Sequence, residues 1–112
     1  MGATAPVGSV RKGANIYVLQ IEHPIRDFDT WKVAFDRVDG RRQQSGVRRH
    51  RVLQPTDNPN YVMIDLEFDS ASEAEAFLAF LQRNVWSSQE AAPALMGDPQ
   101  TRIIEVVESK DY

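Results

Sequence analysis

The chain contains no cysteine, and this absence excludes several kinds of chemistry at once. Disulfide bonds, thiolate metal sites and a cysteine nucleophile are all ruled out. Secreted domains of this size often depend on disulfides, so the sequence favours a cytoplasmic protein. The chain also lacks the roughly 20 consecutive apolar residues that a membrane-spanning helix needs. Residues 1–15 lack the apolar run of a signal peptide, so we expect a soluble protein.

Motifs for phosphate, nucleotide and metal sites are missing as well. There is no Gly-rich phosphate loop, no Gly-x-Ser-x-Gly elbow and no dinucleotide-binding fingerprint. The spacings His-x-Glu and His-x-x-x-His, which would place two metal ligands together, do not occur. We therefore expect no metal ion and no cofactor. The net charge of −3 opposes non-specific attraction to nucleic acid or to an anionic membrane, so neither is an expected partner.

The length of 112 residues suffices for one domain with one hydrophobic core. Residues 1–14 are rich in Gly, Ala and Pro and are predicted to be a flexible tail, and residues 109–112 to be a short C-terminal tail. Residues 15–108 are predicted to form the domain. Runs dense in apolar and β-branched residues, bounded by proline and glycine, predict four strands. These strands cover residues 16–23, 47–54, 61–68 and 101–107.

Two amphipathic helices are predicted between these strands. Asp27 or Asp29 can cap the first helix, whose large apolar residues recur at steps of three and four. Residues 41–44 are predicted to be solvated helix or a frayed last turn, with Gly46 as the left-handed stop. The second helix, residues 72–83, begins at a capping box formed by Ser70 and Glu73. The apolar stripe of the first helix consists of Phe28, Trp31, Phe35 and Val38.

The order of these elements is β-α-β-β-α-β, which predicts an α+β fold of the ferredoxin-like type. Right-handed crossovers give a four-stranded sheet with strand order 4-1-3-2 and both helices on one face. Alternation along residues 61–68 turns Val62, Ile64, Leu66 and Phe68 toward the helices. The free face then mixes apolar residues with carboxylates, and such a face favours an interface over exposure to water. Its residues are Ile16, Val18, Gln20, Glu22, Tyr61, Met63, Asp65 and Glu67, with either Ile103 or Ile104 from the last strand.

Three segments of the chain resemble a known group of proteins. They are Ile25–Asp36 with its Trp-Lys-x-x-Phe-Asp pattern, Gly46-Val47, and Asp57–Asn60 leading into Leu66-Glu67-Phe68. Over residues 16–107 the chain is similar to the dimeric α/β-barrel superfamily. Within it, the match is to small bacterial proteins near the antibiotic-biosynthesis monooxygenases and the polyketide-cyclase-like members.

The resemblance implies a homodimer with a ligand cavity between sheet and helices. It also implies an apolar or aromatic small-molecule ligand and, in an enzyme, a cofactor-independent monooxygenase, isomerase or cyclase activity. The alternative is a non-catalytic ligand-binding or stress-associated barrel, because this fold hosts several activities. Haem-degrading members need a histidine on the second helix. Residues 72–83 contain none, which argues against that activity.

The candidate catalytic residues are His23, Asp65 and Glu67. His23 ends the first strand, and its ordinary pKa near neutrality suits a general acid–base or a ligand anchor. The alternative is a strand-end histidine bonded to a loop carbonyl, and strict alternation turns it toward the helices. Asp65 and Glu67 lie about 7 Å apart on one strand face. They are expected either to share a proton or steer a ligand, or simply to pair with Arg49 or Arg51.

The candidate ligand-binding residues are mostly aromatic. Trp31 and Phe35 either belong to the core or form an aromatic wall for a planar ligand. Tyr61 and Met63 lie on the free face, and His50 is either a site residue or a solvated residue on an edge strand. A basic stretch could bind a phosphate or carboxylate through bidentate forks, or its charges could discourage sheet-to-sheet aggregation. This stretch contains Arg37, Arg41, Arg42, Arg48, Arg49 and Arg51.

Overall fold

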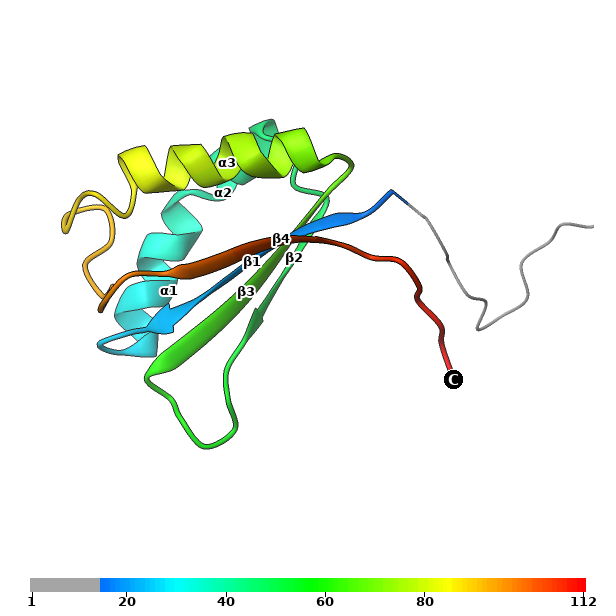
Figure 1. The fold of residues 1–112 in the computed structure, drawn as a ribbon. Coiled ribbons are helices and arrows are strands. Elements are labelled where there is room, and N and C mark those ends of the chain that lie inside the picture. Colours follow the sequence, from blue (N-terminus) through cyan, green and yellow to red (C-terminus); the bar gives the residue numbers. More distant parts are fainter. Residues whose placement is uncertain (1–14) are drawn as a thin grey trace, which may run out of the picture.

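The structure is a computed structural model that describes residues 15–112. The predicted flexible tail at residues 1–14 lies outside the described residues. The chain forms one four-stranded sheet with its helices on a single face (Figure 1). The strands are β1 (Tyr17–Pro24), β2 (Arg49–Leu53), β3 (Tyr61–Phe68) and β4 (Gln100–Glu105), and the helices are α1 (Phe28–Arg37), α2 (Asp39–Gln44) and α3 (Ala71–Asn84).

The sheet has the predicted topology. Its strand order is β2-β3-β1-β4 and every neighbouring pair is antiparallel, which is the order 4-1-3-2 viewed from the other edge. Leu19 of β1 pairs with Leu66 of β3 on one side and with Ile103 of β4 on the other. These three residues therefore share the face that the helices cover, and Ile103 rather than Ile104 belongs to the core.

Side-chain caps begin both long helices, as the sequence predicts. The Asp27 carboxylate accepts a hydrogen bond from the backbone N–H of Thr30 at 2.7 Å, and this bond lowers the pKa of Asp27. Ser70 Oγ accepts from the backbone N–H of Glu73 at 3.2 Å and donates to the Glu73 carboxylate at 3.1 Å. The predicted Ser70 cap at the start of α3 is confirmed, and Glu73 accepts from the Ser70 hydroxyl instead of from the Ser70 backbone N–H that a full capping box uses.

The first helical region differs from the prediction. It consists of two helices, because Val38 lies outside the helical conformation between α1 and α2. Residues 41–44 form most of α2, which is the solvated-helix alternative, and Arg41, Gln43 and Gln44 are exposed. Arg42 is the exception, because only 4% of its surface is exposed. Its guanidinium lies over the Phe35 ring at 3.7 Å from the ring centroid, which accounts for the inward orientation. Gly46, with φ of 94°, is the predicted left-handed stop.

The core fills the space between the helices and the sheet. Trp31 of α1 stacks on Phe35, with ring centroids 4.8 Å apart, and Phe68 of β3 packs against Phe77 of α3. The segment between α3 and β4, residues 85–99, closes one end of this layer. Backbone hydrogen bonds fix it to the end of β1, from Arg26 N–H to the Ala94 carbonyl and from Met96 N–H to the Pro24 carbonyl. Among residues 15–112, no helix has the length and hydropathy to cross a bilayer.

Candidate functional site

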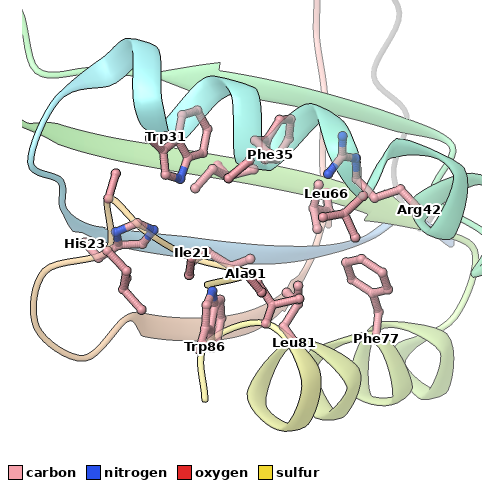
Figure 2. Close-up of a pocket in the computed structure, with 17 residues that line it drawn as sticks. Ile21, His23, Trp31, Phe35, Arg42, Leu66, Phe77, Leu81, Trp86 and Ala91 are labelled. Atoms are coloured by element: carbon pink, nitrogen blue, oxygen red, sulfur yellow. The ribbon is translucent and has the colours of Figure 1, made fainter. Parts of the chain in front are cut away.

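A cavity lies inside the helix-covered layer, between the sheet and the helices (Figure 2). It has a volume of about 60 Å³. The sheet contributes Ile21, Ile64 and Leu66 as its floor, and α1 and α3 contribute the walls. Residues 85–95 contribute the remaining side, where Trp86 and Ala91 face the interior. The lining is almost entirely apolar, with His23 and Arg42 as its ionisable side chains.

His23 stands at one end of the cavity, and 3% of its surface is exposed. The alternation of β1 turns its ring toward the helices, on the same face as Ile21. Nδ1 lies 2.9 Å from the Pro24 carbonyl oxygen. A carbonyl oxygen only accepts hydrogen bonds, so Nδ1 carries a proton and Nε2 of the neutral ring is left as an acceptor. The ring is thus bonded to a backbone carbonyl, as the alternative predicted, although this carbonyl belongs to the last residue of β1 instead of a loop. The bond leaves one ring nitrogen for another partner.

Burial sets the charge of His23. Because the surrounding side chains remove water from the ring, burial lowers the pKa of His23 below its ordinary value of 6.5. The hydrogen bond to Pro24 acts in the opposite direction and is the smaller effect. At neutral pH the imidazole is therefore uncharged and has a free lone pair. A group in this state can accept a proton from a ligand in the cavity.

Aromatic rings form two opposing walls. Trp31 and Phe35 lie on the α1 side, and Phe28 packs against Trp31 with ring centroids 5.7 Å apart. Trp86 lies on the opposite side, beside Leu81 of α3 (Figure 2). Trp31 and Phe35 pack in the core, as one of the two alternatives predicted, and the same stacked pair also lines the cavity.

Arg42 stands at the other end of the cavity from His23 (Figure 2). The sequence indicated an arginine-rich stretch but did not single out this member. Helical spacing could have identified it, because Arg42 follows Phe35 by seven residues and Val38 by four, which continues the apolar stripe of α1. The helix break at Val38 does not move Arg42 off this side of the molecule.

The structure does not bring Asp65 and Glu67 together with His23. Both carboxylates project from the face of β3 that the helices leave free, whereas His23 lies on the covered face. Each pairs with an arginine of β2, from Arg51 Nη2 to Asp65 Oδ2 at 3.1 Å and from Arg49 Nη2 to Glu67 Oε2 at 2.7 Å. This is the cross-strand pairing that the sequence offered as the alternative. A single chain therefore does not form the expected three-residue site.

The remaining predicted ligand-binding residues lie outside the cavity. Tyr61 and Met63 are on the free face, where the Tyr61 hydroxyl donates to Glu22 at 2.7 Å. That hydrogen bond raises the pKa of Tyr61. His50 faces the helix side and contacts Phe35 edge-on, with ring centroids 5.2 Å apart, but it is not part of the cavity lining. Within residues 15–112, no cluster of three or more potential metal ligands occurs.

No protein-family model matches the sequence, and no curated protein is significantly similar to it. Solved structures do match. SnoaB from Streptomyces nogalater, a cofactor-independent oxygenase, superimposes with a TM-score of 0.63 at 15% identity, over 82% of this chain and 93% of that one. A dimeric ferredoxin-like protein from an uncultured marine organism gives a TM-score of 0.57 at 12% identity, over 82% and 95%. The chain has the ferredoxin-like fold.

A third match agrees with the superfamily that the sequence resembles. It is a candidate antibiotic biosynthesis monooxygenase from Nitrosomonas europaea, with a TM-score of 0.55 at 16% identity, over 83% of this chain and 91% of that one. The fold that the resemblance implies is therefore confirmed. At these identities the matches establish the fold alone.

Proposed function

We propose that this protein binds an apolar or aromatic small molecule in the cavity between sheet and helices, and that His23 accepts a proton from it. The pairing of a neutral, buried imidazole with an otherwise apolar, aromatic-walled cavity carries the proposal. Proton removal at a carbon next to a carbonyl is chemistry that a histidine performs without a metal or flavin. The cofactor-independent oxygenase among the matching folds is consistent with such a cavity.

We also propose that the protein is a homodimer that pairs through the free face of its sheet. Figure 1 shows no helix on that face. Leu53 and Met63 are register partners there, with 39% and 36% of their surfaces exposed, beside the ion pairs of Asp65 and Glu67. Exposed apolar side chains among neutralised charges are typical of a face that a partner covers. A solved protein of the same fold is described as dimeric.

The cavity volume of about 60 Å³ is far below the roughly 300 Å³ at which pockets for drug-sized ligands begin. A one-ring or two-ring ligand therefore requires the walls to move outward. One wall of the cavity is formed by residues 85–99, which belong to no helix or strand and carry Trp86 between α3 and β4. We propose that this wall is the one that moves. The small volume favours non-catalytic binding of a compact ligand as a second candidate function.

The experiment that separates the two functions uses 1-indanone, a flat aromatic ketone with exchangeable hydrogens beside its carbonyl. Binding is followed by isothermal titration calorimetry, and hydrogen exchange into deuterated buffer is followed by proton NMR. The matched variant is His23→Asn, because the asparagine amide can still donate to the Pro24 carbonyl but lacks Nε2. We expect the parent to bind the ketone and to accelerate its exchange, and His23→Asn to bind it without acceleration.

Binding without acceleration by the parent would contradict the catalytic function and support the binding function. Equal acceleration by the parent and by His23→Asn would show that His23 is not the base. If neither this ketone nor the one-ring compounds benzoate and benzamide bind, the cavity is only a packing defect. In each case the far-ultraviolet circular dichroism of the variant verifies that it is folded.

A further inference from the structure

The guanidinium of Arg42 is buried with incomplete hydrogen bonding. Its strongest polar contact is from Nη2 to Asp39 Oδ1, at the long distance of 3.4 Å. Nε has no hydrogen-bond partner, and it is the one buried side-chain nitrogen or oxygen in residues 15–112 left in that state. Buried donors of this kind are rare, because leaving a charged donor unpaired away from water costs several kcal/mol or more in free energy.

The surroundings of Arg42 determine where a partner for Nε can lie. One face of the guanidinium is covered by the Phe35 ring, 3.7 Å from the ring centroid, and Asp39 lies toward the surface with its side chain half-exposed. The side chain enters the cavity at the end opposite His23 (Figure 2). A planar guanidinium offers its donors in the plane of the fork, so an acceptor for Nε approaches edge-on rather than through the Phe35 ring.

We infer that Arg42 is the anion-binding group of the cavity, and that the ligand is an aromatic acid whose carboxylate accepts a hydrogen bond from Arg42 Nε. This inference rests on the proposed function, since it assumes that the same cavity takes an aromatic ring. The carboxylate end of the ligand lies at Arg42 and the ring lies between the aromatic walls. The opposite end of the ligand then faces Nε2 of His23.

Two features of the cavity support an acid over a neutral ligand. Arginine binds carboxylates through charge-assisted hydrogen bonds that are about twice as strong as neutral ones. The cavity has no carboxylate in its lining. The acidic groups that act on Arg42 are Asp39 and Asp36, and the one hydrogen bond between them and the guanidinium is made by Nη2, which leaves Nε for the ligand. A carboxylate also supplies the acceptor that Nε lacks, which a neutral hydrocarbon does not.

The test uses three probes that differ in one property each. Benzoate has a ring and a carboxylate, benzamide has the same shape without the charge, and acetate has the charge without the ring. The Nε–Hε signal of Arg42 in a nitrogen-15 correlation spectrum reports the contact directly in the parent protein. Its assignment comes from triple-resonance spectra of the parent protein. The variant Arg42→Met is compared with the matched control Arg41→Met, which removes the neighbouring arginine that stacks on Phe80.

We expect benzoate to bind roughly ten-fold or more tightly than benzamide in the parent and in Arg41→Met, and to shift the Nε–Hε signal. In Arg42→Met this preference should disappear while benzamide still binds. If Arg42→Met does not fold, the direct shift of the Nε–Hε signal in the parent still decides the question.

Equal binding of benzoate and benzamide with an unmoved Nε–Hε signal would overturn the role of Arg42 and leave the aromatic cavity standing. A shift caused by acetate, with no binding of either aromatic probe, would support an anion site but contradict the aromatic ligand. No response to any of the three probes would overturn the role of Arg42, and it would overturn the aromatic cavity as well if 1-indanone also fails to bind. A preference for benzoate that persists in Arg42→Met would place the anion elsewhere.

Discussion

Trp31 belongs both to the core and to the wall of the cavity, so replacing it with alanine tests the packing of the helices on the sheet. Only 8% of its surface is exposed, and its ring stacks on Phe35 and packs against Phe28. Removal of a buried tryptophan side chain costs about 3–5 kcal/mol of unfolding free energy. A domain of this size is stable by only about 5–15 kcal/mol, so Trp31→Ala should be folded but markedly weakened.

Urea denaturation measured by circular dichroism is the assay. The midpoint should fall while the slope of free energy against urea stays unchanged, because the surface exposed on unfolding is nearly the same. Thermal unfolding should show a decrease in Tm of roughly 12 °C or more. The matched control is Val33→Ala on the same helix, where 54% of the valine surface is exposed and the change should stay within about 0.5 kcal/mol.

A loss below about 1 kcal/mol in Trp31→Ala, or a loss equal to that of Val33→Ala, would refute the packing described here. It would mean that α1 presents another side to the sheet. The cavity would then have different walls, and the site assigned to His23 would have to be abandoned along with them.

Three further predictions concern other parts of the molecule. Because burial lowers the pKa of His23 below 6.5, the unfolded chain binds more protons there, so unfolding free energy should decrease as pH falls from about 8 to 5. This decrease should be smaller in His23→Asn. If His50→Asn reduces the pH dependence of the unfolding free energy and His23→Asn does not, His23 is not its source. Ser70→Ala should cost about 1 kcal/mol in urea denaturation through loss of the helix cap, and a smaller loss than in Ser72→Ala would be inconsistent with that cap. Met63→Lys should weaken the dimer about a hundred-fold by burying an unpaired charge, and analytical ultracentrifugation showing an unchanged dimer would remove Met63 from the interface.

The sequence predicts most of the fold because the signals are local. Alternation along residues 61–68 coincides with β3, and the Ser70 box locates the start of α3 to within one residue. The strand order follows from handed crossovers, which depend on the order of the elements and not on individual side chains. Gly40 indicates a weak point near the end of the first helix, but the break lies two residues earlier, at Val38, which no proline or glycine marks.

The candidate site was predicted only in part, because it depends on which side of the sheet each side chain faces. Alternation already turned His23 toward the helices, yet Asp65 and Glu67 were grouped with it across the sheet. His23, Asp65 and Glu67 could form one site only if the cavity lay on the free face of the sheet. The cavity lies on the opposite face, which the helices cover. Arg42 and Trp86 were not predicted as site residues, because residues that are distant in the sequence enclose them.

The proposed ligand site lies between the sheet and the helices. Its most direct test is a titration of methyl-labelled protein with 1-indanone, followed by carbon-13 correlation NMR. Ile64 and Met63 are neighbours in β3 that face opposite sides of the sheet, and Leu81 lines the cavity from α3. We expect the methyl signals of Ile64 and Leu81 to shift and the Met63 signal to stay unchanged. Shifts confined to Met63 and Ile104, with Ile64 and Leu81 unmoved, would contradict it.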